Sequence, residues 1–160
     1  MKDKVTTRQE LASRLEERRR QGQRIVFTNG CFDLMHIGHI RYLQAARNLG
    51  DVLVVGVNSD ESVRALNKGA DRPIVPDAQR AEVLAALACV DYVVTFSEPD
   101  PGALIATLQP DILVKGGDWS VDRIVGRETV EARGGRVQTI PLVPGVSTTT
   151  LVQRIRSTTA

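Results

Sequence analysis

The sequence predicts an α/β fold in which a single doubly wound parallel sheet is flanked by helices. Short apolar runs alternate along the chain with segments of helical periodicity. The run at residues 52–57 is almost entirely Val and Leu, which is typical of a strand covered on both faces. Right-handed crossovers between such strands place ligand sites at the carboxyl ends of the strands.

The first helix is expected over residues 7–21. Thr7 and Glu10 have the spacing of a capping box, and Leu11 and Leu15 recur on one helical face. We treat residues 1–22 as an N-terminal helical extension and residues 23–160 as the main domain. The arginines that end the helix are interpreted as a solvated helix end rather than a polyanion contact; they are Arg18, Arg19 and Arg20.

The other elements follow from the same two periodicities. Strands are expected at residues 24–28, 52–57, 92–96, 112–115 and 137–142, and helices at residues 38–49, 60–66, 77–88, 101–108, 122–133 and from about residue 147.

The longest irregular segment is residues 67–78, which carries Gly69, Pro73 and Pro76. Long loops in compact domains are often functional. We therefore expect this loop to close over a bound triphosphate through Lys68, a long and flexible cation. An ordinary surface loop with a solvated lysine is the alternative.

Composition limits the possible functions. The chain has 160 residues, 42% of them apolar, and a formal net charge of +2, so no strong basic field argues for nucleic acid. No apolar stretch approaches the ~20 residues of a membrane span, and the first residues lack a signal-peptide core. Two cysteines, Cys31 and Cys89, are too few for a disulfide framework. These features predict a soluble cytoplasmic protein that binds neither nucleic acid nor a membrane.

The most informative segment is residues 28–39, TNGCFDLMHIGH, which leaves a strand, turns at glycine and enters a helix. Both histidines of the chain, His36 and His39, flank Gly38. A helix N-terminus binds phosphate, and two imidazoles could stabilise charge that develops on a phosphoryl group. A metal site with Cys31 is an alternative, but the ligand spacing is poor and a fourth ligand is not evident. A purely structural role is the other alternative.

Two further segments resemble phosphate and sugar sites. Gly145 precedes Ser147, Thr148 and Thr149, which could cap a helix or hold phosphates through hydroxyls and amides. At another strand end lies VKGGDW, residues 114–119, in which glycines allow close backbone approach and Asp118 could accept hydrogen bonds from a ribose. An ordinary turn is the alternative there. Three cations surround the irregular loop, namely Lys68, Arg72 and Arg80.

Taken together, these motifs resemble the cytidylyltransferase-like nucleotidyltransferase family of the H-x-G-H superfamily. TNGCFDLMHIGH, RPIVPDAQRAEVLAAL, PDILVKGGDW and PGVSTT are similar to the branch that adenylylates D-glycero-β-D-manno-heptose 1-phosphate. The resemblance implies a Rossmann-like nucleotidyltransferase domain. It implies catalytic roles for His36, His39 and Lys68; nucleotide contacts from Asn29, Gly30, Cys31, Phe32, Gly38, Lys115, Gly116, Asp118, Gly145, Ser147, Thr148 and Thr149; and acceptor contacts from Asp33, Arg72 and Arg80.

The resemblance also implies partners and a cofactor. ATP and a sugar 1-phosphate would be the substrates, and Mg²⁺ would bind with the triphosphate rather than in a dedicated protein site. We expect a homo-oligomer, most simply a dimer. The rival enzyme is a cytidylyltransferase for glycerol 3-phosphate or a similar alcohol phosphate. Such relatives carry Arg-Thr where this chain has Leu142 and Val143, and Gly-Thr where it has Gly30 and Cys31. A regulatory module that binds nucleotide without turnover is the rival from another class.

Overall fold

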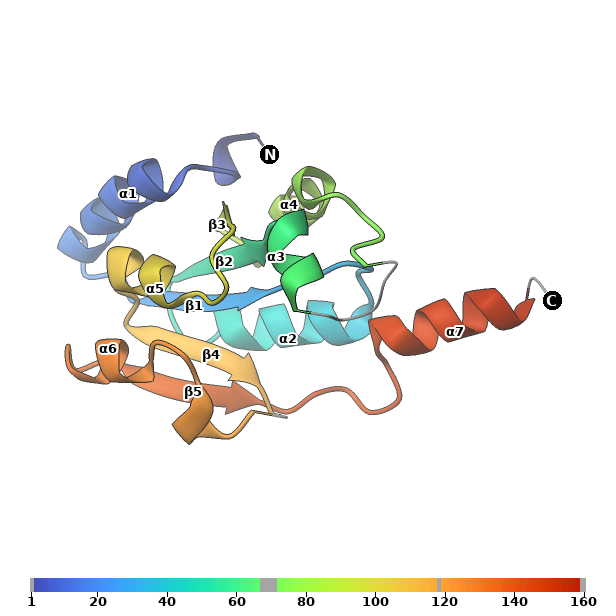
Figure 1. Cartoon of the computed structure of the whole chain (residues 1–160). Helices are drawn as coiled ribbons and strands as arrows, with labels where there is room; N and C mark the ends of the chain where they lie inside the picture. Colours follow the sequence, from blue (N-terminus) through green and yellow to red (C-terminus); the bar gives the residue numbers. More distant parts are fainter. Residues whose placement is uncertain (1, 67–71, 118, 159–160) are drawn as a thin grey trace.

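A computed structural model describes residues 2–66, 72–117 and 119–158. Five parallel strands form one sheet in the order β3-β2-β1-β4-β5, with helices on both faces (Figure 1). The predicted fold class is therefore confirmed. The strands are β1 (Ile25–Gly30), β2 (Val52–Asn58), β3 (Tyr92–Phe96), β4 (Ile112–Gly116) and β5 (Arg136–Ile140). The helices are α1 (Arg8–Arg20), α2 (Ile37–Arg47), α3 (Asp60–Ala65), α4 (Asp77–Ala85), α5 (Gly102–Leu108), α6 (Arg127–Glu131) and α7 (Thr148–Thr158), with 3-10 turns η1 (Lys2–Lys4) and η2 (Val121–Arg123).

Each central strand contributes side chains to two hydrophobic layers, which explains its nearly continuous apolar sequence. Successive residues of a strand point to opposite faces of the sheet. Ile25 and Phe27 of β1 pack in a layer with α1, α5 and α6, whereas Val26 packs in the opposite layer with α2 and α4. Both layers are required, because a parallel sheet exposes neither face to water.

Three aspartates fasten the amino-terminal edge of the sheet. Asp51, Asp91 and Asp111 each stand directly before a strand and accept a hydrogen bond from a backbone amide at, or just before, the start of a neighbouring strand. Their Oδ2 atoms receive the amides of Arg24 at 2.8 Å, Leu53 at 2.7 Å and Ile25 at 2.7 Å, respectively. These bonds satisfy amides that the sheet itself leaves free.

The strand order reverses between β1 and β4. The chain runs outward from β1 to β2 and β3, and then returns to place β4 on the other side of β1. In open α/β sheets, ligands bind outside the carboxyl ends of the strands at such a switch point. The fold therefore predicts a ligand site among the residues that follow β1 and β4.

One predicted helix is wrong. Residues 122–133 do not form a continuous helix; the chain forms the turn η2 and then the short helix α6. Gly126 separates them with φ of +89°, and a Cβ atom there would lie 2.6 Å from Cδ1 of Ile105 on α5. Only glycine fits this contact, and its backbone conformation interrupts the helix. The other boundaries differ from the expected ones by a few residues.

The arginines at the end of α1 correct a second expectation, because two of the three contact other parts of the fold. Arg19 donates to the carbonyl of Leu108 and, at 2.8 Å, to that of Gln109, so it caps the carboxyl end of α5. Arg18 donates to the Tyr92 hydroxyl at 3.2 Å. Only Arg20 makes a surface pair within its own helix, with Glu17.

The helix α1 also contributes to the main core. Leu11 and Leu15 are fully buried and belong to the hydrophobic layer on one face of the sheet. The capping box predicted at its start is present, with Thr7 and Glu10 bonding each other's backbone amides. The treatment of residues 1–22 as a separate extension stays a prediction.

The last helix has a different environment. In Figure 1, α7 projects from the body, and none of its residues is buried. Its Ile155 is 61% exposed.

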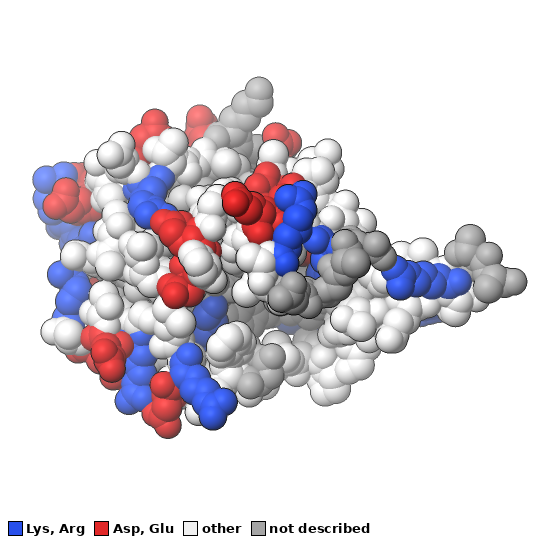
Figure 2. All heavy atoms as spheres, viewed as in Figure 1, with Lys and Arg blue, Asp and Glu red and all other residues white. Residues whose placement is uncertain are grey.

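On the face of the molecule shown in Figure 2, acidic and basic side chains are interspersed rather than segregated. Within the described ranges, every helix is too short or too polar to cross a lipid bilayer.

Candidate functional site

The signature segment occupies the carboxyl end of β1 and the turn that leads into α2. Phe32 in this turn has φ of +48°, a strained backbone conformation for a residue with a side chain. Such strain is concentrated at functional sites, where the surrounding structure holds it. The Phe32 ring meets the His39 ring edge-on, with 5.3 Å between the ring centroids. A Cβ atom at Gly30 would lie 3.1 Å from the Phe32 ring, so glycine leaves room for this arrangement.

The two predicted catalytic histidines form a stacked pair. The ring centroids of His36 and His39 are 3.8 Å apart, and the ring planes differ by 22°. Gly38 lies between them in sequence, and a Cβ atom there would lie 3.0 Å from the His36 ring. The Nδ1 atoms of both rings are buried and have no hydrogen-bond partner among the described residues. Buried polar atoms are normally satisfied, so this pair is suited to a ligand that completes its bonding.

Burial also keeps both imidazoles neutral. It lowers the pKa of His39 to about 4, and the neighbouring His36 adds to the effect. Burial likewise lowers the pKa of His36. The pair begins at the N-terminus of α2, where His36 makes no side-chain cap. The helix terminus therefore offers amide donors beside two neutral rings, which is a favourable environment for an anion.

The low pKa of His39 should make the fold sensitive to mild acid. Between its folded pKa of about 4 and the ordinary value of 6.5, the unfolded chain binds a proton that the folded chain does not. The free energy of unfolding should therefore fall as the pH drops from about 7 to about 4.5, as measured by urea denaturation. His39→Gln should show a smaller fall. The same fall in both proteins would contradict the prediction.

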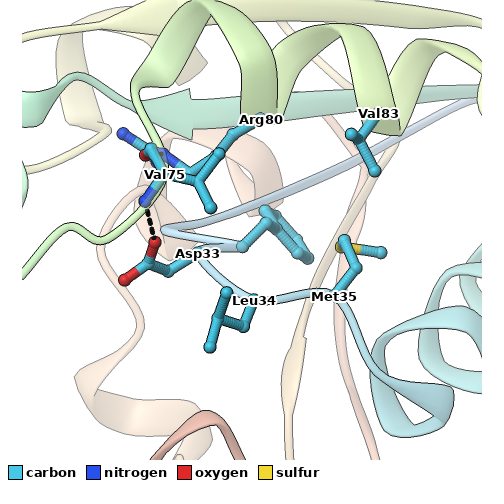
Figure 3. Close-up of a pocket in the computed structure, with 7 residues that line it drawn as sticks. Asp33, Leu34, Met35, Val75, Arg80 and Val83 are labelled. Carbon is cyan, nitrogen blue, oxygen red and sulfur yellow. Dashed lines mark hydrogen bonds between the residues drawn. The ribbon is translucent and has the colours of Figure 1, made fainter. Parts of the chain in front are cut away.

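Of the three residues predicted to contact the acceptor, Asp33 and Arg80 line a cavity of about 140 Å³ (Figure 3), and Arg72 hydrogen-bonds to Asp33. The Asp33 side chain is fully buried. It accepts hydrogen bonds from the amides of Ile74 at 2.9 Å and Val75 at 2.8 Å, and it forms an ion pair with Arg72. Burial alone would raise the pKa of Asp33, but these amides and the guanidinium outweigh it and hold the pKa below its usual value.

Arg80 binds the same segments from the other side. Its side chain is fully buried and donates to the carbonyl oxygens of Cys31 and, at 2.8 Å, Val75. It also pairs with Asp60 at the start of α3, at 2.8 Å. In Figure 3, Asp33 and Arg80 both reach toward Val75. Together they tie the turn after β1 to the segment that precedes α4, and a direct contact with an acceptor stays a prediction.

Two predicted residues lie outside the described residues. Lys68 falls within 67–71, with the first part of the loop expected to close over phosphate, and Asp118 is the other. Their assigned roles stay predictions. The described end of that loop begins at Arg72 and is held by Asp33.

Lys115 and Gly116 lie at the end of β4, across the switch point from β1. The Lys115 ammonium donates to the side-chain oxygen of Asn29, the predicted nucleotide contact at the end of β1. It also lies 5.7 Å from the centroid of the Trp119 ring. Trp119 was not among the predicted site residues. Its signal in the sequence is that it is the only tryptophan and lies two residues after the Gly116-Gly117 pair.

The start of α7 brings the second predicted phosphate segment to the same region. Gly145 has φ of +72°, and Ser147 then accepts the amide of Thr150 at 3.1 Å, so Ser147 caps the helix. Thr148 and Thr149 form the first turn. The loop before them approaches α2, because a Cβ atom at Gly38 would lie 3.8 Å from Cβ of Val143. In Figure 1, α7 accordingly begins beside the N-terminal end of α2.

Ser147→Ala should disturb α7 without destabilising the whole fold. A lost cap typically costs about 0.5–2 kcal/mol. Because no residue of α7 is buried, this loss should appear as fraying of one helix, visible as a small decrease in far-ultraviolet ellipticity. Thr7→Ala is the matched control, since α1 packs into the core and should transmit its loss to the urea midpoint. Equal shifts of the midpoint in both variants would contradict this reading.

The chain is similar to known proteins along nearly its whole length. The chain matches the family described as "Cytidylyltransferase-like" over residues 27–154. It is 56% identical to the bifunctional protein HldE of Syntrophotalea carbinolica over 152 residues, which is 95% of this chain and 31% of that protein. It is 54% identical to the bifunctional protein HldE of Geotalea uraniireducens, covering 96% of this chain and 31% of that protein. The chain thus spans about a third of the length of these relatives.

Solved structures give the same picture. A lipopolysaccharide core biosynthesis protein from Thermoplasma volcanium is 30% identical, with a TM-score of 0.64 over 76% of this chain and 98% of that one. The pantoate-β-alanine ligase of Francisella tularensis, solved with βγ-ATP and β-alanine, has a TM-score of 0.59 at 17% identity. That alignment covers 86% of this chain and 66% of the ligase, and it supports the fold alone.

Proposed function

Since the chain belongs to the cytidylyltransferase-like family, we propose that it is an adenylyltransferase that acts on D-glycero-β-D-manno-heptose 1-phosphate. The reaction would transfer AMP from ATP to the sugar phosphate, giving ADP-heptose and pyrophosphate for the lipopolysaccharide core. The observation that carries the proposal is the identity of more than half of the residues with HldE proteins along almost the whole chain. The stacked histidine pair at the switch point supports nucleotide chemistry.

The proposed chemistry is a direct in-line displacement. A phosphate oxygen of the sugar phosphate attacks the α-phosphorus of ATP, and the bond from that phosphorus to the β-phosphate oxygen breaks. Pyrophosphate leaves with the electron pair. The attacking oxygen is already anionic at neutral pH, so a general base is not required. Catalysis then rests on positioning and on stabilising the charge that develops.

Several residues of the candidate site would supply that stabilisation. The neutral rings of His36 and His39 would donate hydrogen bonds to the phosphoryl oxygens as charge grows on them. The first amides of α2 face the same region, and those of α7, with Thr148 and Thr149, would hold the β- and γ-phosphates. Asn29 and Lys115 would flank the nucleotide at the switch point. Lys68 would reach the phosphates, and Asp118 the ribose.

Mg²⁺ would enter with the triphosphate and neutralise part of its charge. Among the described residues there is no group of three or more His, Cys, Asp or Glu side chains that could hold a metal ion. The proposed ion would be octahedral, with phosphate oxygens and water as its main ligands. We further propose a cytoplasmic enzyme, consistent with free thiols at Cys31 and Cys89, that assembles as a homodimer.

Pyrophosphate release tests the proposal. The purified chain is offered ATP, CTP, GTP and UTP, each with heptose 1-phosphate or glycerol 3-phosphate. We expect ATP with heptose 1-phosphate to give the highest kcat/KM, because Leu142 and Val143 stand where CTP-using relatives carry Arg-Thr. Faster turnover of CTP with glycerol 3-phosphate would replace this assignment with the cytidylyltransferase. Binding of nucleotide without turnover of any pair would indicate a regulatory module.

A further inference from the structure

We propose that Trp119 is the platform on which the base of the nucleotide stacks, and that it favours a purine over a pyrimidine. This inference deepens the proposed function and rests on the chain binding a nucleoside triphosphate. Three observations carry it: the place of Trp119 in the sheet, the exposure of its ring and the cation beside it.

Trp119 lies at the switch point of the sheet. It follows β4 after a tight turn in which its amide donates to the carbonyl of Gly116 at 3.1 Å. The segments after β4 and β5 lie against each other here, because a Cβ atom at Gly117 would be 3.2 Å from Cα of Pro141. A ligand that enters the crevice between the ends of β1 and β4 therefore meets Trp119.

The ring is unusually exposed for this protein. Trp119 is 49% exposed, whereas Phe27, Phe32, Phe96 and Tyr92 are buried. Two apolar side chains in the adjoining segments are exposed too: Val121, two residues further along the chain, at 37%, and Leu142, which follows Pro141, at 54%. An exposed apolar area at the rim of a ligand site is a common feature of binding surfaces. The flat faces of an indole fit the flat faces of a nucleobase.

The cation beside the ring favours a ligand that carries negative charge. The Lys115 ammonium lies 5.7 Å from the ring centroid, close enough for a cation–π interaction, and hydrogen-bonds to Asn29 on β1. An aromatic platform next to a positive charge is the combination that binds nucleotides, because the base stacks while the cation attracts the anion. A purine has a larger stacking area than a pyrimidine, so the platform should favour ATP over CTP.

The first test uses the wild-type protein, because Trp119 is its only tryptophan and therefore its only tryptophan fluorophore. ATP should quench the tryptophan emission and protect it from quenching by acrylamide. Tripolyphosphate, which has no base, should do neither at saturation. Emission and acrylamide access that remain unchanged with saturating ATP would overturn the proposal.

The second test uses calorimetry on variants. Trp119→Ala should weaken ATP binding about 5- to 150-fold, leave tripolyphosphate binding unchanged and reduce the preference for ATP over CTP. Trp119→Phe should restore most of the affinity. Val125→Ala, in the same connection between β4 and β5, is the matched control and should bind ATP normally. Unchanged ATP affinity in Trp119→Ala would refute the platform alone, whereas a wild-type chain that binds no nucleotide would refute the proposed function.

Discussion

His39→Ala is expected to lower kcat by ~10²–10³, the usual cost of removing one preorganised donor to developing charge. The ring of His39 is stacked on His36 at 3.8 Å and held edge-on by Phe32, so its position is already set before a ligand arrives. Its loss should leave ATP affinity less affected than turnover, because the interaction strengthens in the transition state. Steady-state pyrophosphate release and calorimetric ATP binding measure the two effects.

The stacking of His36 on His39 suggests a double-variant test. If the two imidazoles act as a unit, removing both should lower kcat little more than removing one. Gln44→Ala, an exposed position on the same helix, is the control and should have wild-type kcat. Near-normal turnover in both His36→Ala and His39→Ala would exclude the proposed mechanism. Loss of the folded state in these variants would instead assign the pair a structural role.

Asp33→Asn is expected to destabilise the fold by about 3–5 kcal/mol, the usual cost of breaking a buried ion pair from one side. The Asp33 side chain is fully buried, and its carboxylate accepts two backbone amides besides pairing with Arg72. An amide side chain has one acceptor oxygen fewer and carries no charge, so these donors would be left incompletely satisfied. Urea denaturation gives the change in the free energy of unfolding.

The control for this prediction is Asp122→Asn. Asp122 also pairs with an arginine, Arg127, but its side chain is 83% exposed. Exposed ion pairs contribute little, so this variant should lose at most about 1 kcal/mol. Equal losses in the two variants would mean that the burial of Asp33 is not what makes its ion pair important.

The sheet could be predicted because its signal is local. The strands β1 to β4 are short, mainly apolar runs bounded by turns, and the layers that bury them follow from strand geometry. The break at Gly126 could not be predicted, because it depends on the close approach of Gly126 to Ile105 on α5. These two residues meet only in the folded chain. The arginines of α1 gave a wrong expectation for the same reason: Arg19 meets α5 only after folding.

The candidate site, like the fold, could be predicted from the sequence only in part. The segment that contains His36 and His39 could be placed at a strand end and a helix start from its sequence, but not the stacking of the rings. Asp33 and Arg80 were recognised as charged residues near the site, yet a sequence does not reveal that their bonding capacity is used by neighbouring backbone. Trp119, the proposed base platform, was not predicted as a site residue because a single aromatic residue in a turn has no periodic pattern.

The three aspartates at the amino-terminal edge have a consequence for how such a fold can change. Asp51, Asp91 and Asp111 fasten one end of the strands with side chains that lie away from the carboxyl edge, so strand registry does not depend on the segments that meet the ligand. The segments after β1, β4 and β5 can therefore be exchanged for others of different length or chemistry while the sheet keeps its order. A scaffold of this kind can become specific for a new acceptor substrate through altered turns, while the residues that determine the sheet stay unchanged.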